Sequence, residues 1–286
     1  MQVCGSDNFA ETIATLLNCE FVSIEKTVFP DFEVRPRFLK TEFSGKVVLI
    51  ERMKVPVDPN AYVIELLLEI NTLKDMGAET VDVVMPYFVY SRQDKAFREG
   101  EPFSAKYIVD LLRHAGAGKI YVVESHTRND FGAVKNIDGF VAIGRYFFSA
   151  GAKGALVIAP DEKAARGAQT VAREIEGDVA VMRKTRDRGT GEIITDAGNL
   201  DARGREVIIV DDIVSSGKTM LNALRLAREA GARRIQCAVV HPITQRGIFN
   251  VSKEADGFFA CDTVDSALSV IPTAGMITEA IKRDNI

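Results

Sequence analysis

Segments with the hydrophobic spacing of helices alternate with short apolar strands along most of the chain. The helical segments end at four Gly-Ala pairs, which are Gly77-Ala78, Gly116-Ala117, Gly151-Ala152 and Gly231-Ala232. Glycine suits the left-handed residue that ends a helix, and helices alternating with apolar strands indicate a parallel sheet covered on both faces. The pattern therefore predicts an α/β fold. The strands expected after these pairs are residues 81–85, 120–123, 155–159 and 235–240.

A longer repeat relates the two halves of the chain. A turn and strand begin at Gly45 and lead through a loop to a helix with its closing Gly-Ala pair, and the same series begins again at Gly204. The first glycines of the two series are 159 residues apart and the closing glycines are 154 apart. We therefore expect two similar lobes, residues 1–143 and 144–286, each a mostly parallel sheet flanked by helices.

The two lobes differ most in the loop that follows this strand. In the second lobe, the strand and the helix are joined by Ser215, Ser216, Gly217, Lys218 and Thr219. Backbone N–H groups and the helix dipole attract a phosphate at such a place, glycine permits the turn, and the hydroxyl groups add donors. The segment is not a nucleoside-triphosphate P-loop, because Asp212 stands where that motif needs its first glycine. A capped helix start with ordinary turn residues is the alternative interpretation.

Two carboxylates precede this loop. Asp211 and Asp212 end the apolar strand at the carboxyl edge of the predicted sheet, where α/β proteins bind their ligands. Carboxylates beside a phosphate would repel it unless they hold another part of the same ligand, such as the hydroxyl groups of a sugar. A pentose 5-phosphate would satisfy both halves of the site.

The composition excludes several classes of protein. Hydrophobic residues make up 47% of the 286 positions and charged residues 27%, and the net charge is −4. A negative chain is not expected to coat nucleic acid, and no apolar run approaches the roughly 18 residues of a membrane span. The N-terminus resembles no secretion signal, so we expect a cytoplasmic protein with no nucleic-acid or membrane partner. The four cysteines form no C-x-x-C pair, which disfavours a zinc site and a disulfide framework.

Residues 210–219 read Val-Asp-Asp-Ile-Val-Ser-Ser-Gly-Lys-Thr and resemble the signature loop of phosphoribosyltransferase-fold proteins. Nearly the whole chain is similar to one branch of them, the ribose-phosphate pyrophosphokinases. The resemblance implies two phosphoribosyltransferase-like lobes, with ATP on the first lobe and ribose 5-phosphate on the second. It also implies that the acidic pair holds the ribose hydroxyl groups while the 215–219 loop holds the 5-phosphate. Lys218 stands where the family often has a small residue.

A first-lobe segment resembles the part of this family that binds the triphosphate. Arg92, Gln93 and Asp94 follow a predicted strand, and the resemblance implies that all three bind ATP. A forked guanidinium suits phosphate oxygens. A solvated charged loop is the alternative interpretation, and the preceding Tyr87, Phe88 and Tyr90 disfavour it.

A second element of the first lobe consists of Phe29, Asp31, Phe32 and Glu33, and it resembles the family segment that holds adenine across a subunit interface. Phe32 stands in the place of the usual glycine. The resemblance therefore implies a homo-oligomer whose ATP site lies near a subunit interface.

Two residues at predicted strand ends resemble the family's metal-binding positions. His126 follows the strand at 120–123, and the resemblance implies that it contacts both ATP and the metal. Asp161 follows the strand at 155–159, where the family uses an aspartate to assist Mg²⁺. This ion prefers oxygen ligands and keeps several waters, so one carboxylate and the substrate phosphates are enough. A hydrogen-bonded histidine at the rim of the site is the alternative interpretation of His126.

A basic segment completes the expected site. Residues 182–191 carry four cations and two glycines between predicted strands. Lys184 and Arg186 resemble the catalytic pair of the family's flexible loop, which stabilises the charge of the transferring group, and Arg186 is also expected to contact ribose 5-phosphate. The alternative interpretation is a solvated hairpin tip.

The expected activity is the Mg²⁺-dependent transfer of the β,γ-diphosphoryl group of ATP to O1 of ribose 5-phosphate, which gives phosphoribosyl pyrophosphate and AMP. Two alternatives stay open: a phosphoribosyltransferase, and a regulatory subunit without turnover. The Arg92 segment disfavours the first, because a minimal transferase lacks it. Lys184, Arg186 and His126, all present, disfavour the second.

Overall fold

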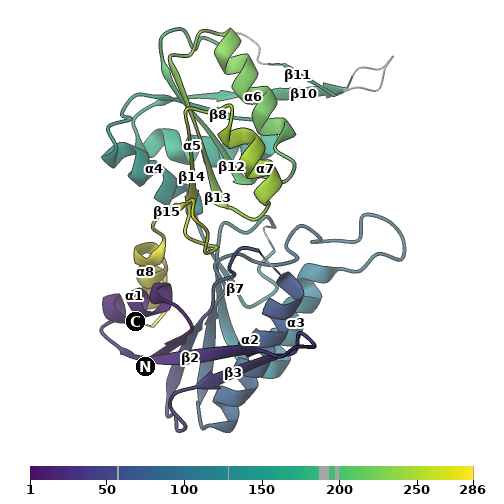
Figure 1. The fold of residues 1–286 in the computed structure, drawn as a ribbon, viewed down its shortest axis with the longest axis vertical. Coiled ribbons are helices and arrows are strands. Elements are labelled where there is room, and N and C mark those ends of the chain that lie inside the picture. The colour runs from purple at the N-terminus through teal and green to yellow at the C-terminus, as the bar shows by residue number, and fades with distance from the viewer. Residues whose placement is uncertain (57, 128, 187–192, 197–199, 286) are drawn as a thin grey trace. The chain divides into compact units, whose positions relative to one another are not determined.

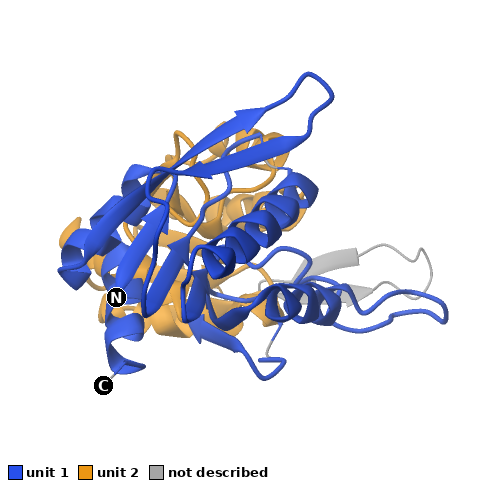
Figure 2. Ribbon diagram, turned by 90° about the horizontal axis from the view of Figure 1, so that it is seen from below, with its two compact units in different colours: residues 1–137, 274–286 blue, residues 138–273 orange. Residues whose placement is uncertain are grey.

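The computed structural model describes the chain apart from residues 57, 128, 187–192, 197–199 and 286. The chain forms two compact units, each built on its own sheet (Figure 1). Unit 1 comprises residues 1–137 and 274–286, and unit 2 comprises residues 138–273 (Figure 2). None of the described helices is long and apolar enough to cross a bilayer.

Unit 1 contains a seven-stranded sheet in the order β3-β2-β1-β4-β5-β6-β7. All neighbouring strands are parallel except the edge hairpin β2-β3. The strands are β1 (Gln2–Gly5), β2 (Glu20–Val28), β3 (Val34–Phe38), β4 (Lys46–Ile50), β5 (Thr80–Val84), β6 (Ala117–Val123) and β7 (Val134–Ile137). The helices are α1 (Asn8–Leu17), α2 (Pro59–Asp75), α3 (Ser104–Ala115) and α8 (Ala274–Arg283). The core lies along the central strands, since the four apolar residues that end β4 are at most 1% exposed.

Unit 2 contains a six-stranded, fully parallel sheet in the order β15-β14-β13-β12-β8-β9. Its strands are β8 (Leu156–Ala159), β9 (Asp178–Val181), β12 (Glu206–Ile213), β13 (Arg234–His241), β14 (Gly257–Cys261) and β15 (Ser269–Ile271). A separate antiparallel pair consists of β10 (Arg183–Arg186) and β11 (Ile193–Asp196). The helices are α4 (Gly139–Ser149), η1 (Glu162–Ala164), α5 (Ala165–Glu174), α6 (Lys218–Glu229) and α7 (Gln245–Ser252).

The two sheets repeat one topology. The sheet of unit 1 contains the order β2-β1-β4-β5-β6-β7, and that of unit 2 runs β9-β8-β12-β13-β14-β15. Strand for strand these orders are the same, which confirms the two similar α/β lobes expected from the sequence repeat. The helix-ending glycines are confirmed as well, because all four have a left-handed φ. The values are 99° at Gly77, 112° at Gly116, 84° at Gly151 and 82° at Gly231.

The division between the units differs from the expected boundary between residues 143 and 144. It lies between Ile137 and Asp138, because α4 packs against α5 of unit 2 although it follows β7 of unit 1. In the same way α8 follows β15 of unit 2 but packs against α1 of unit 1. The ranges 1–143 and 144–286 therefore need two corrections. Hydrophobic spacing predicts where a helix forms but not which sheet it covers.

Candidate active site

The 215–219 loop follows β12 and includes the first two residues of α6. Gly217 is the residue before α6 and has a φ of 80°. As a glycine, it offers no side chain to cap the helix. The loop borders a pocket of about 100 Å³. The pocket is lined by Asp211, Ile213, Val214, Ser215, Ser216, Gly217, Lys218, Thr219 and Met220. A helix N-terminus that opens on a pocket in this way is suited to hold an anion.

One local hydrogen bond at this loop links a side chain to the first residue of α6. The backbone N–H of Lys218 donates to Ser216 Oγ over 3.4 Å, which is long for such a bond. A bond of this length contributes little as a helix cap.

A second glycine shapes the loop from a distance in sequence. A Cβ atom on Gly217 would lie 2.9 Å from the carbonyl oxygen of Gly247, and one on Gly247 would lie 2.1 Å from that of Ser215. Both distances are shorter than real Cβ contacts, so both positions need glycine if α7 is to pack against the loop. Sequence reasoning identified Gly217 but missed Gly247, whose only signal is a glycine in the first turn of a helix.

Three carboxylates lie at the same edge of the sheet of unit 2. Ile158 of β8 pairs with Ile209 of β12, so Asp161, just after β8, and the pair Asp211-Asp212, near the end of β12, lie at the same level of neighbouring strands. Burial, and then the nearby carboxylates of Asp212 and Asp161, raise the pKa of Asp211 well above its ordinary value. Negative charge gathered next to an anion loop is suited to hydroxyl donors or a cation.

The carboxylates also organise the backbone around them. Asp211 Oδ1 accepts the backbone N–H of Asp212 at 2.9 Å, and Asp212 Oδ1 accepts that of Ile213 at 2.8 Å. Asp161 Oδ1 accepts the backbone N–H groups of Lys163 and Ala164 and so caps η1. Each of these bonds uses one oxygen, Oδ1, of the carboxylate concerned.

The residues expected to bind the triphosphate follow adjacent strands of unit 1. Arg92, Gln93 and Asp94 lie in the loop after β5, and His126 lies after β6, which pairs with β5 in parallel. Arg92 and His126 are exposed. The Nε2 amide of Gln93 donates to the carbonyl oxygen of Lys95 at 3.1 Å, so this side chain also holds its own loop in shape.

Backbone strain accompanies these segments. Tyr90 and Glu124 have left-handed φ values of 61° and 41°, two residues before Arg92 and His126 respectively. Residues other than glycine seldom adopt this conformation, and such strain concentrates at functional sites. The two strained residues therefore agree with a ligand-binding role for the loops that carry them.

The segment expected to hold adenine lies elsewhere in unit 1. Phe29, Asp31, Phe32 and Glu33 form the tip of the β2-β3 hairpin, at the far edge of the sheet. Strands β1 and β4 separate β2 from β5, so the sheet order does not bring this tip next to Arg92 and His126 within unit 1. Phe32 has a φ of 69°, which shows that the hairpin keeps the backbone shape of a glycine at this position.

The basic segment falls partly outside the described residues. Lys184 and Arg186 belong to β10, which pairs with β11, and only their backbone is described. Residues 187–192, which include the two glycines of this segment, lie outside the described part of the chain. The expected catalytic pair thus stays a prediction.

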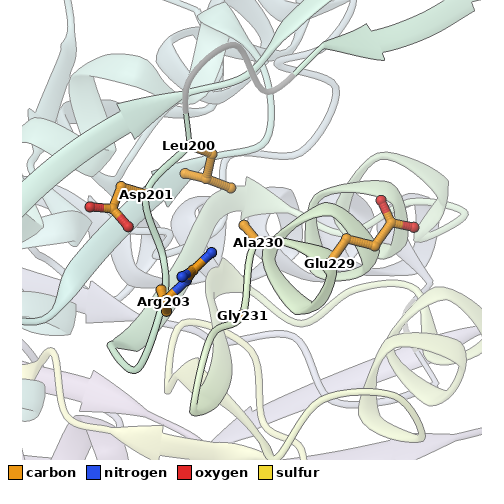
Figure 3. A pocket seen from close by; sticks show the side chains of 6 residues that line it. All are labelled: Leu200, Asp201, Arg203, Glu229, Ala230 and Gly231. Carbon is orange, nitrogen blue, oxygen red and sulfur yellow. The ribbon is translucent and has the colours of Figure 1, made fainter.

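A second hollow in unit 2, of about 390 Å³, lies at the opposite end of α6 (Figure 3). It is lined by Leu200, Asp201, Arg203, Glu229, Ala230 and Gly231. Its charged side chains are exposed, and the carboxylates of Asp201 and Glu229 point away from one another (Figure 3). These groups do not converge on a common point, so the hollow has none of the chemistry seen at the 215–219 loop.

Comparison with known proteins identifies the family. Residues 2–116 match the family described as the N-terminal domain of ribose phosphate pyrophosphokinase, and residues 139–270 match the phosphoribosyl transferase domain. A ribose-phosphate pyrophosphokinase of Saccharolobus solfataricus is 34% identical over 83% of this chain and 82% of its own length. The chain belongs to the ribose-phosphate pyrophosphokinase family. The resemblance expected from the motifs is thereby confirmed.

Further members of the ribose-phosphate pyrophosphokinase family align along the whole chain. The protein of Methanosarcina acetivorans is 32% identical over 99% of this chain and 100% of its own length. The crystal structure of phosphoribosylpyrophosphate synthetase from Mycobacterium smegmatis has a TM-score of 0.82 and covers 99% of this chain and 98% of that one, at 23% identity. The similarity to this crystal structure supports the fold of two units, each with its own sheet.

Proposed function

We propose that the protein is a ribose-phosphate diphosphokinase. It transfers the β,γ-diphosphoryl group of ATP to O1 of ribose 5-phosphate and releases phosphoribosyl pyrophosphate and AMP. The observation that supports this most is the edge of unit 2, where an anion loop adjoins the carboxylates of Asp161, Asp211 and Asp212. A sugar that carries both a phosphate and free hydroxyl groups matches that arrangement.

In this proposal, unit 2 holds the acceptor. The 5-phosphate binds to the 215–219 loop, while Asp211 and Asp212 accept hydrogen bonds from the ring hydroxyl groups. These contacts orient O1 for in-line attack on the β-phosphorus of ATP. The new O1–phosphorus bond forms as the bond to the α-phosphate oxygen breaks, and the proton of the hydroxyl group passes to solvent. Positioning contributes most of the catalysis, so no general base is assigned.

Unit 1 holds the donor. Arg92 and His126 are exposed at the ends of adjacent strands, where they can bind the phosphates of ATP, and Gln93 and Asp94 complete this loop. The adenine base binds to Phe29, Asp31 and Glu33 at the hairpin tip. Because the sheet order separates this tip from Arg92, we propose that the tip serves the ATP site of a neighbouring copy and that the protein is a homo-oligomer.

Mg²⁺ is the metal that the donor set fits. The carboxylates at the edge of unit 2 supply only oxygen ligands, and the raised pKa of Asp211 indicates an environment that a cation would stabilise. Within the described part of the chain, no three residues form a complete metal cage. Mg²⁺ needs none, since one or two carboxylates, substrate phosphates and water suffice. We assign Asp161 and His126 to this ion, which would neutralise the oxygens of the triphosphate when bound.

Lys184 and Arg186 are assigned to the transition state. As AMP leaves, its α-phosphate oxygen gains negative charge, and two cations at this point would stabilise that charge. Arg186 would also contact ribose 5-phosphate. Replacement of either residue by alanine should lower kcat by orders of magnitude and change the KM for ribose 5-phosphate only a few-fold.

The decisive experiment is to identify the nucleotide product. The full-length protein is incubated with ATP, Mg²⁺ and ribose 5-phosphate, with Lys184→Ala as the inactive control, and the products are separated by chromatography. We expect AMP in equal amount to phosphoribosyl pyrophosphate. ADP would indicate attack at the γ-phosphorus by an ordinary sugar kinase. Release of pyrophosphate from phosphoribosyl pyrophosphate in the presence of a base would indicate a phosphoribosyltransferase, and ligand binding without any product would indicate a regulatory subunit.

A further inference from the structure

Phe32 occupies a position in the β2-β3 hairpin that favours glycine. The strands end at the pair Val28 and Val34, and Phe29 and Glu33 continue the hairpin, with the Phe29 N–H donating to the Glu33 carbonyl oxygen at 2.8 Å. The Phe32 N–H donates to the carbonyl oxygen of Phe29 at 2.9 Å and closes a tight turn. In three-residue hairpin loops of this kind, the last residue is left-handed and is usually glycine.

Packing of the Phe32 ring does not offset the strain of its backbone. Its φ of 69° is strained for any residue with a Cβ, and its side chain is 85% exposed. It makes no ring contact with another residue of the part of the chain that the structure describes.

The other left-handed phenylalanine shows what packing normally provides. Phe131 has a φ of 46°, and its ring lies 5.6 Å from that of Phe103 and 6.5 Å from that of Phe88. Burial of aromatic surface can offset backbone strain at Phe131. No such contact offsets the strain at Phe32, which points to a partner outside the chain.

The surroundings of Phe32 indicate the chemistry of that partner. Phe29, on the same tip, is 38% exposed and carries the Arg35 guanidinium 5.0 Å from its ring centre. Asp31 and Glu33 are exposed beside the two rings and offer carboxylate oxygens as acceptors. Flat aromatic faces with adjacent acceptors match a nucleobase that has an exocyclic amino group.

We propose that Phe32 is a specificity-determining residue that adds a second aromatic surface to the base of the nucleotide donor. This inference rests on the proposed function, which places the adenine base at this hairpin tip. The ring of Phe32 covers part of the base that Phe29 alone leaves open to water. A purine gains more from this surface than a pyrimidine does, because its two fused rings offer more area for stacking.

The test compares the variants Phe32→Gly and Phe32→Tyr with the wild-type protein. Loss of one stacking contact should raise the KM for ATP about tenfold in Phe32→Gly, with kcat and the KM for ribose 5-phosphate within about twofold. Removal of the strained side chain should also raise Tm by about 2–4 °C. Phe32→Tyr, which keeps an aromatic face, should retain the KM for ATP. Phe148→Ala, which removes an exposed ring from α4, is the matched control and should leave the KM for ATP unchanged.

Selectivity among donors gives a second measurement. In Phe32→Gly the preference for ATP over CTP, expressed as the ratio of kcat/KM values, should fall several-fold. An active Phe32→Gly variant with the ATP affinity and donor preference of the wild type would overturn the inference. The inference would also be overturned if light scattering showed that Phe32→Gly dissociates into subunits and the loss of ATP affinity accompanied that dissociation. Phe32 would then anchor a neighbouring copy.

Failure of the proposed function can be separated from failure of this inference. Absence of AMP from the wild-type reaction would contradict the function, whereas calorimetric titration of ATP into the wild type and Phe32→Gly still measures the contact with the base. Weaker binding to the variant would support the role of Phe32, and equal binding would overturn it.

Discussion

The carboxyl edges of the two sheets share a topology but handle charge in opposite ways. In unit 1, Glu51 and Arg52 directly follow β4, as Asp211 and Asp212 end the equivalent strand β12 of unit 2. Arg52 Nη2 lies 2.8 Å from Asp7 Oδ2, so opposite charges meet within unit 1. In unit 2, the corresponding positions are the carboxylates of Asp161, Asp211 and Asp212, and burial, followed by the neighbouring negative charges, raises the pKa of Asp211. The first edge is neutralised by its own chain, and the second is suited to a ligand.

Lys26 completes the neutralisation of unit 1. Lys26 Nζ lies 2.6 Å from Glu51, 2.9 Å from Glu65 and 3.5 Å from Glu69. Glu51 is 1% exposed and Glu69 is fully buried. In unit 1, the ammonium group of Lys26 thus lies among the carboxylates. In unit 2, a similar group of carboxylates would attract a cation or sugar hydroxyl groups.

The helices after these strands differ in the same sense. In unit 1, Asp58 Oδ1 accepts the backbone N–H groups of Asn60 at 2.9 Å and Ala61 at 3.1 Å, and so caps α2. In unit 2, Gly217 precedes α6 and provides no side-chain cap. The N-cap side chain thus accepts the first N–H groups of α2 in unit 1, whereas the N-cap residue of α6 offers no side-chain acceptor in unit 2.

The largest effect is expected at Lys26, whose partners Glu51 and Glu69 are buried. Lys26→Met should lower the free energy of unfolding by about 3–5 kcal/mol, because it leaves buried carboxylates without their cation. Urea denaturation of both proteins measures the difference. Lys40→Met is the control, since the ion pair of Lys40 with Glu20 is solvent-exposed and should contribute little. Equal stability losses in the two variants would contradict the view that unit 1 depends on its internal cation.

The next effect concerns ligand affinity at the equivalent carboxylates. Asp211→Asn should raise the Kd for ribose 5-phosphate about 10- to 100-fold, because it removes a charged acceptor for the ring hydroxyl groups. Its affinity for ATP should stay unchanged, as calorimetric titration of both ligands will show. Glu51→Gln, at the equivalent position of unit 1, is the matched control and should leave both affinities unchanged. If the two variants weaken the binding of ribose 5-phosphate equally, the two edges do not differ in the proposed way.

A smaller effect should appear in the pH dependence of stability. Burial, and then the charge of Glu51, raise the pKa of Glu69 well above its ordinary value, against the opposing charge of Lys26 and with a further increase from Glu65. The folded protein therefore keeps a proton on Glu69 at pH values where the unfolded chain has lost it. The free energy of unfolding should fall as pH rises from the ordinary to the raised pKa, by at most about 1.4 kcal/mol per pH unit.

Glu69→Gln separates this contribution from the other titrating groups. The variant should lack the decline, so its stability relative to the wild type should increase across that pH window. Urea denaturation at a series of pH values measures the difference. A constant difference between the two proteins at every pH would contradict a raised pKa for Glu69.

Local sequence patterns predicted most of the fold and one edge of the site. The helix-ending glycines and the strands after them could be predicted from neighbouring residues alone. The duplicated series starting at Gly45 and Gly204 predicted the repeated sheet. The domain boundary was wrong because the packing of α4 and α8 depends on surfaces far away in the chain. The carboxylates of β12 could be placed because adjacent residues end a single strand.

The internal neutralisation of unit 1 could not be read from the sequence. Lys26 is 25 residues from Glu51 and 39 from Glu65, and no short pattern links these charges. The need for glycine at Gly247 is likewise visible only once α7 lies against the 215–219 loop. Long-range contacts of this kind arise from tertiary packing, so sequence spacing contains no direct signal for them.

The smallest effect separates the two helix starts. Asp58→Ala should destabilise the protein by about 1 kcal/mol, because the first-turn N–H groups of α2 lose their side-chain acceptor, and should leave the Kd for ribose 5-phosphate unchanged. Ser216→Ala should do the reverse and weaken the binding of ribose 5-phosphate several-fold with little change in stability, because the hydrogen bond from the Lys218 N–H to Ser216 Oγ is long, at 3.4 Å. Thermal unfolding and calorimetric titration of both variants measure the two quantities. A stability loss in Ser216→Ala as large as that in Asp58→Ala, with unchanged affinity, would show that both lobes merely cap their helices and would remove the distinction between them.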